Sequence, residues 1–142
     1  MANARTNGHA SGFGRLLVVI YAIFAIAATS RSVIQLTTRF DEAPVAYLLS
    51  ALAAVVYIIA TIALGVGERG KKVAAAAITF ELVGVLVVGT LSLIESSWFP
   101  RATVWSGFGI GYALIPFILP IVGLWWLRRE RISGGSTNNI AR

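Results

Sequence analysis

The stretch AAAAITFELVGVLVVG, residues 74–89, contains only apolar or small side chains apart from Thr79 and Glu81. The apolar run continues on both sides, over residues 73–94. As a helix rising about 1.5 Å per residue, a segment of this length crosses a hydrocarbon core about 30 Å thick. A carboxylate near the middle of such a helix is costly in contact with lipid. We therefore expect Glu81 to face other helices rather than the bilayer.

The composition of the whole chain agrees with a membrane environment. Of its 142 residues, 57% are hydrophobic and 13% are charged, whereas a soluble domain has about 45–50% apolar and about 25% charged residues. The chain has no cysteine and one histidine, His9. These counts exclude disulfides, thiolate nucleophiles and metal sites built from several histidines. We expect no metal site and no cofactor.

Four apolar segments divide the chain. They predict an all-α polytopic membrane protein with four transmembrane helices in two antiparallel hairpins, which together form one domain over residues 15–129. Short polar pieces flank this domain, and their glycines and small polar residues are typical of flexible tails. The predicted spans are residues 15–36, 44–66, 73–94 and 102–127, and the predicted flexible cytoplasmic tails are residues 1–14 and 130–142.

The distribution of basic residues predicts the orientation. With the N-terminus inside the cell, most Lys and Arg residues fall on the cytoplasmic side, as the positive-inside rule requires. Both termini are then cytoplasmic and the protein is a multi-pass plasma-membrane protein. Trp98 and Trp105 fall near the predicted outer interface. The cytoplasmic set is Arg5, Arg15, Arg69, Lys71, Lys72, Arg128, Arg129, Arg131 and Arg142, and the outer set is Arg31, Arg39 and Arg101.

The first apolar segment has a second interpretation. Arg15, the short apolar run after it and AIA at residues 25–27 also resemble a cleavable signal peptide. Cleavage would leave three spans in the same orientation, so the charge bias does not distinguish the two. The apolar continuation SVIQL at residues 32–36 favours a retained span.

Polar side chains inside the predicted spans form a candidate intramembrane site. Counted from the cytoplasmic ends of the helices, Glu81 and Tyr57 lie at similar depths near the bilayer midplane, and Arg31 and Tyr112 share a level about 10 Å further out. We expect the Tyr57 hydroxyl to donate a hydrogen bond to Glu81. We also expect Glu81 to be protonated, because ionisation in this environment costs solvation.

The fourth segment contains two prolines four residues apart. Pro116 and Pro120 each remove a helical hydrogen-bond donor, and Pro116 would leave the carbonyl of Tyr112 free. Together with the glycine-rich stretch GFGIG at residues 107–111, they predict a bent helix. No strand precedes GFGIG, so it is a close-packing surface rather than a dinucleotide-binding loop.

Three stretches carry a resemblance to known proteins. They are ATSRSVIQLTTRFDEAPVAYLLSALAAVVYIIATIAL at residues 28–64, ELVGVLVVGTLSL at residues 81–93 and ATVWSGFGIGYALIPFILPIVGLWWLRR at residues 102–129. This texture resembles a group of small, uncharacterised four-span membrane proteins of actinobacteria, over residues 15–129. The resemblance implies a bacterial plasma membrane and implies no activity.

The expected function is that of a structural or accessory subunit. Four spans with little mass outside the bilayer leave few places for independent chemistry, and we expect no enzymatic activity because no nucleophile and base are paired. The partners are the lipid bilayer and either a second copy or a larger membrane protein; nucleic acid is not expected, because the basic residues are split among short segments. The alternative is a small oligomeric transporter or channel that uses Glu81 as a proton or cation site.

Overall fold

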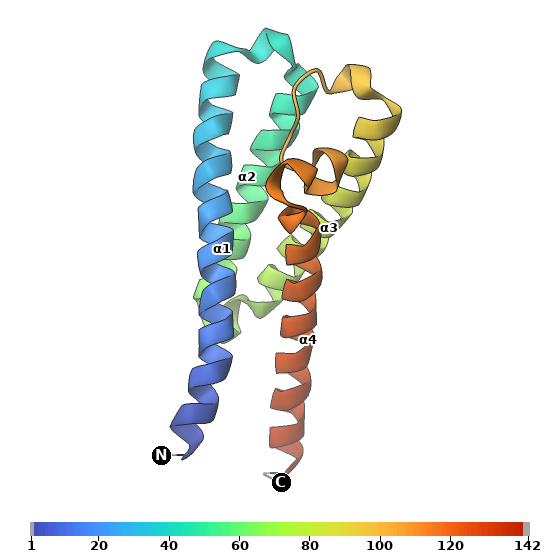
Figure 1. The fold of residues 1–142 in the computed structure, drawn as a ribbon. Helices are drawn as coiled ribbons and strands as arrows, with labels where there is room; N and C mark the ends of the chain where they lie inside the picture. The colour runs from blue at the N-terminus through green and yellow to red at the C-terminus, as the bar shows by residue number, and fades with distance from the viewer. Residues whose placement is uncertain (1, 141–142) are drawn as a thin grey trace.

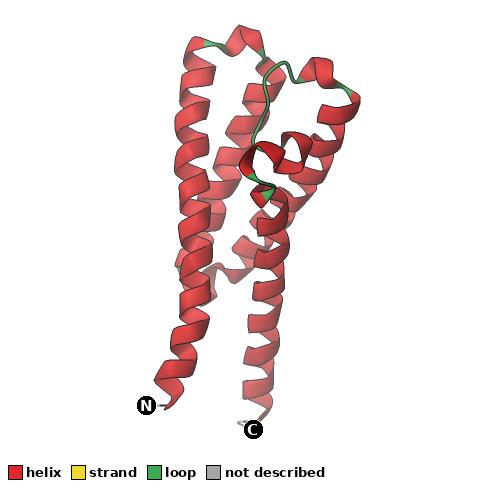
Figure 2. Ribbon diagram, in the orientation of Figure 1, coloured by secondary structure: helices red, strands yellow, loops and turns green. Residues whose placement is uncertain are grey.

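The computed structural model describes residues 2–140, and these residues form helices and connections with no strand. Figure 2 shows how little of the chain lies outside helices. The four long helices are α1 (Ala2–Thr38), α2 (Pro44–Gly65), α3 (Lys71–Ile94) and α4 (Ile115–Ile140), and the short 3-10 helices are η1 (Phe40–Glu42), η2 (Gly67–Gly70), η3 (Ser96–Trp98) and η4 (Ser106–Tyr112). The expectation of an all-α protein is confirmed.

The long helices pack side by side along the length of the molecule. Helix α1 packs along α2, α2 packs against α3, and α3 packs against both η4 and α4. Both chain termini lie at one end of the bundle, here called the terminal end, and η2 lies toward the same end, with α1 and α4 extending past it (Figure 1). The connections η1 and η3 lie at the other end, here called the opposite end. This arrangement sets which side chains meet at each level.

Three helical segments are long and apolar enough to cross a membrane. They are Gly12–Thr38, Pro44–Gly65 and Gly67–Ile94. Large apolar side chains on their outer faces are exposed, among them Ile26 at 69% and Ile62 at 61%. Exposed apolar surface on this scale is expected where lipid covers the protein.

The fourth segment, predicted as a bent span over residues 102–127, consists of two helices separated by a sharp bend. Helix η4 and the part of α4 up to Glu130 together are apolar enough to span, but they meet at an angle of 99°. The backbone has left-handed φ angles at Gly109 (83°), Ala113 (57°) and Leu114 (62°). Glycine adopts such angles without strain, and a run of them ends a right-handed helix. The described part of the chain therefore has three helices long and apolar enough to cross a membrane, or four if the bent pair counts as one.

The terminal segments are helical where flexible tails were predicted. Helix α1 begins at Ala2 and α4 ends at Ile140. Once a helix has formed, each further residue adds a backbone hydrogen bond without a new nucleation cost, so polar flanking residues can continue it. Flexibility of residues 1–14 and 130–142 stays a prediction, and residues 1, 141 and 142 lie outside the described part of the chain.

Small and aromatic side chains fill the centre of the bundle. Ala53, Ala60 and Ala74 have no exposed surface, and neither do Tyr21 and Tyr57. The alanines allow helix backbones to approach closely, as small residues do in membrane helix pairs. The aromatic rings then fill the wider space between α1, α2 and the segment before η4.

Candidate functional site

Glu81 lies in the interior of the bundle, bonded to the first helix. Its side chain projects from α3 and has no exposed surface. The hydroxyl of Tyr21, on α1, donates a hydrogen bond to Glu81 Oε2 over 2.7 Å. This bond joins α1 to α3, although α1 packs mainly along α2.

The second carboxyl oxygen of Glu81 has no partner. Glu81 Oε1 is buried and forms no hydrogen bond with any described residue. The two ion pairs among these residues, Lys71 with Glu68 and Arg101 with Glu42, do not involve Glu81. A carboxyl group without a nearby cation in such surroundings is far more stable when neutral.

The expectation that the Tyr57 hydroxyl donates a hydrogen bond to Glu81 is wrong. Its hydroxyl accepts a 2.9 Å hydrogen bond from the indole Nε1 of Trp105. Its ring packs against Tyr21, with centroids 6.2 Å apart, and against Phe24, with centroids 5.6 Å apart. Tyr57 therefore belongs to the same aromatic cluster as the donor to Glu81, without being that donor.

The directions of the helices explain why Tyr21, and not Tyr57, donates to Glu81. Side chains on a helix tilt toward its N-terminus. Helix α3 begins at the terminal end and α2 begins at the opposite end (Figure 1). The rule therefore tilts Glu81 toward the terminal end, where it accepts from Tyr21. It tilts Tyr57 toward the opposite end, where its hydroxyl accepts from Trp105. A count of residues along each helix does not include this tilt.

Trp105 is a core residue rather than an interfacial one. Its side chain is 1% exposed. The backbone N–H groups of Trp105 and Ser106 both donate to Thr103 Oγ1, over 3.1 and 3.0 Å, which holds the turn that carries the indole. Gly84 on α3 makes room for the ring, because a Cβ there would lie 2.6 Å from Trp105 Cζ3. Trp105, expected near the outer membrane interface, is therefore enclosed by protein rather than exposed to lipid or water.

The segment around Trp105 explains why its side chain is buried. The irregular connection after η3 leads into the bundle before η4 begins (Figure 2). Thr103 and Val104 are buried like Trp105. Non-helical backbone at this level is stable because protein covers it. From the sequence alone, a tryptophan near the start of an apolar segment is equally consistent with the first turn of a helix and with a connection that enters the bundle.

Arg31 and Tyr112 meet near the opposite end of the bundle. Arg31 Nη1 donates to the Tyr112 hydroxyl over 2.6 Å, and Nη2 donates to the carbonyl oxygen of Ala102 over 3.0 Å. The shared level assigned to these two residues from the sequence is consistent with this contact. Arg31 does not pair with Glu81, and it bonds to the hydroxyl of Tyr112 rather than to its backbone carbonyl.

The bend of the fourth segment lies before the two prolines. The left-handed residues Ala113 and Leu114 separate η4 from α4, which begins at Ile115. Pro116 falls in the first turn of α4, where its missing N–H costs nothing. Pro120 lies inside α4. Pro116 therefore starts a helix rather than bending one.

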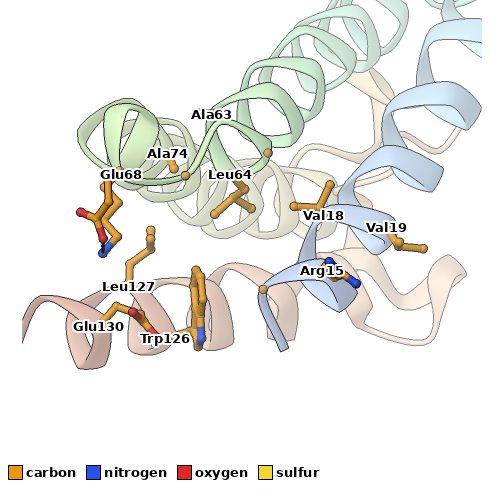
Figure 3. A pocket seen from close by; sticks show the side chains of 14 residues that line it. Arg15, Val18, Val19, Ala63, Leu64, Glu68, Ala74, Trp126, Leu127 and Glu130 are labelled. Carbon is orange, nitrogen blue, oxygen red and sulfur yellow. Dashed lines mark hydrogen bonds and ion pairs between the residues drawn. The ribbon is translucent and has the colours of Figure 1, made fainter. Parts of the chain in front are cut away.

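A cavity of about 580 Å³ opens at the terminal end, away from Glu81. Figure 3 shows Arg15 from α1, Glu68 from η2 and Glu130 from α4 around its rim, with Trp126 and Leu127 beside them. The rim carries both signs of charge, since Lys71 also lines it and pairs with Glu68 over 2.7 Å. Among the described residues no group of three or more potential ligands could hold a metal ion.

The fold defines a class of protein. The described chain is a helical protein whose apolar helices are long enough to lie in a membrane, with one buried carboxyl group among aromatic side chains. Comparison with family models, with curated protein sequences and with solved structures finds no match to this chain. Its function therefore has to be argued from its own geometry.

Proposed function

We propose that this chain is an integral, multi-pass plasma-membrane protein that acts as a structural or accessory subunit. It packs against a second copy of itself or against a larger membrane protein. The proposal includes a bacterial plasma membrane, as the resemblance of residues 15–129 to four-span actinobacterial proteins implies. The proposal rests on the buried hydrogen bond between Tyr21 and Glu81.

That hydrogen bond has the character of a structural contact. Both side chains have no exposed surface, and Glu81 is not among the residues that line the 580 Å³ cavity at the terminal end. A polar pair buried within a membrane bundle stabilises the association of its helices. Glu81 thus connects α3 to α1, and the apolar outer faces of the helices remain available for lipid and for a partner.

The proposed topology has two antiparallel hairpins and both termini in the cytoplasm. It is supported by the shared end of the two termini in Figure 1 and by the excess of Lys and Arg at that end. Reporter fusions after Gly67 and after the C-terminus are expected to report cytoplasm, and a fusion after Ser97 the outside. A C-terminal reporter on the outside would refute the four-span topology, because the bent segment would then not cross.

Copurification in a mild detergent tests the accessory function. We expect the chain extracted from its native membrane to copurify with a stoichiometric partner, either itself or a larger membrane protein. Glu81→Ala is expected to reduce the recovered complex, whereas Glu81→Gln keeps the shape of the side chain and an oxygen that accepts from Tyr21. If the chain is extracted in full from the native membrane and still purifies as a monomer with no other protein, the proposal is contradicted.

One observation favours transport as a second candidate function. Glu81 Oε1 is buried and unpartnered, and ionisable groups inside membranes are often proton or cation sites. In a small oligomeric transporter or channel, Glu81→Gln would abolish flux without changing the fold or the oligomeric state. Proton flux into proteoliposomes, measured with a pH-sensitive dye, distinguishes this function from the accessory one, because an accessory subunit carries no flux in either variant.

A further inference from the structure

A second polar site lies at the opposite end of the bundle. A cavity of about 310 Å³ is lined there by Arg31, Ile34, Gln35, Arg39, Tyr47 and Arg101. This set, here called the arginine pocket, contains every arginine and lysine that the sequence places at this end. Three cations from two separate parts of the chain thus converge on one cavity whose lining includes no carboxylate.

Arg31 contributes a cation that no carboxylate compensates. Its two hydrogen bonds go to the neutral oxygens of Tyr112 and Ala102, and no described carboxylate forms an ion pair with it. A guanidinium group carries five N–H donors. Arg31 therefore has donors left for a ligand, and its charge in the outer part of an apolar helix favours an anion beside it.

The other charged groups around the pocket do not neutralise it. Arg101 pairs with Glu42 at 3.9 Å, and their side chains are 60% and 49% exposed. Exposed pairs of this kind are weak. Glu42 also accepts a hydrogen bond from the Tyr47 hydroxyl over 3.3 Å, which holds it beside the pocket but outside its lining. Arg39 is exposed and forms no ion pair among the described residues.

Two further lining residues add to the site. Gln35 also lines the cavity, and a glutamine side chain carries two amide N–H donors that an anion can accept from. Ile34 is 58% exposed and places an apolar surface next to the cations. A cavity with a cationic lining and an apolar flank fits a ligand that has an anionic head.

We propose that the arginine pocket binds a phosphate-bearing anion. Guanidinium groups bind phosphate oxygens through paired, charge-assisted hydrogen bonds, a geometry that a single lysine does not reproduce. The phosphate belongs either to the headgroup of an anionic phospholipid or to a soluble molecule. The two sources share this chemistry and differ in whether an acyl chain lies along Ile34.

The test compares a variant of the pocket with the native chain. The purified protein in detergent is incubated with equal amounts of phosphatidylglycerol and phosphatidylcholine, and bound lipid is measured by native mass spectrometry. The variant Arg31→Gln/Arg39→Gln/Arg101→Gln is expected to bind phosphatidylglycerol at least about tenfold more weakly, since hydrogen bonds to charged groups are lost. The variant Arg39→Gln/Arg101→Gln changes only exposed side chains, so it tests the pocket even if loss of Arg31 impairs folding.

A matched control removes the same charge from the other end of the bundle. Arg69→Gln/Lys72→Gln/Arg128→Gln changes three exposed residues at the terminal end and is expected to bind like the native chain. A parallel titration with inorganic phosphate, without anionic lipid, is followed by thermal unfolding. Stabilisation by phosphate that the pocket variant loses indicates a soluble ligand, and selective retention of phosphatidylglycerol indicates a lipid.

Three results would overturn the proposal. The first is a native chain that shows neither selectivity for phosphatidylglycerol nor stabilisation by phosphate. The second is binding by both pocket variants as tight as that of the native chain. The third is a control variant that loses binding as strongly as the pocket variants do, which would place the anion at the terminal end. Each outcome removes the arginine pocket as the binding site.

Discussion

Replacing Tyr21 with phenylalanine removes the hydroxyl that donates over 2.7 Å to Glu81 Oε2. The variant keeps the ring, so packing against the neighbouring aromatic residues is preserved. It leaves both oxygens of Glu81 without a protein partner, because Oε1 already has none among the described residues. The cost of this change depends on whether Glu81 is charged.

The structure favours a small loss of stability in Tyr21→Phe. No cation lies beside Glu81 in the described part of the chain, so the neutral carboxyl group is the expected form. Loss of a neutral hydrogen bond costs about 1 kcal/mol, and loss of one to a charged group costs about 1.5–3 kcal/mol. Hydrogen bonds between membrane helices average about 0.6 kcal/mol. We therefore expect Tyr21→Phe to lower the free energy of unfolding by about 1 kcal/mol.

A double-mutant cycle separates the two protonation states. The free energy of unfolding is measured for the native chain, Tyr21→Phe, Glu81→Gln and the double variant, by titrating mixed micelles with a denaturing detergent and following tryptophan fluorescence. Glutamine offers Tyr21 a neutral acceptor of the same shape. If Glu81 is protonated, Tyr21→Phe costs nearly the same in both backgrounds, with a coupling energy below about 0.5 kcal/mol.

An ionised Glu81 would give a different result. Tyr21→Phe would then cost more in the native background than in Glu81→Gln, with a coupling energy above about 1 kcal/mol. Infrared spectroscopy gives an independent readout, because a protonated Glu81 shows a carboxyl band at neutral pH that Glu81→Gln lacks. A large coupling energy together with no such band would refute the protonated carboxyl group.

Three other substitutions test the packing around the bend and the buried carboxyl group. Gly84→Ala places a Cβ 2.6 Å from Trp105 Cζ3, and the overpacking is expected to cost about 1–3 kcal/mol and to shift the tryptophan emission. Gly109→Ala forces alanine to a φ of 83° and is expected to destabilise the fold by about 1–2 kcal/mol. Gly111→Ala is the control for these two glycine variants. Open space surrounds Gly111, so this control is expected to change stability little. Glu81→Lys puts an ammonium group into the interior and is expected to abolish the folded protein in the membrane fraction, because a buried charge without a partner is costly; normal levels of this variant would show that Glu81 reaches water.

The burial of Glu81 was predicted from the sequence. Glu81 stands out because it is an acidic residue within an apolar run, and burial by other helices follows from the cost of a carboxylate in lipid. The contact between Arg31 and Tyr112 agrees with their shared level. The bonds of Tyr57 and Trp105 could not be predicted, because they depend on the direction in which each side chain leaves its helix and on a connection that enters the bundle.

Composition and the length of apolar runs determine by themselves that this chain forms helices suited to a membrane, since backbone groups in lipid must bond within their own segment. They also determine that Glu81 is buried. Only the tertiary structure decides that Tyr21 is its donor: α2 and α3 run in opposite directions, so the tilt of side chains toward each helix N-terminus separates Tyr57 from Glu81 and brings Tyr21 to it. The sequence also predicts that the fourth segment bends, but only the tertiary structure places the bend at the left-handed residues before the two prolines, which are Gly107, Phe108, Gly109, Ala113 and Leu114.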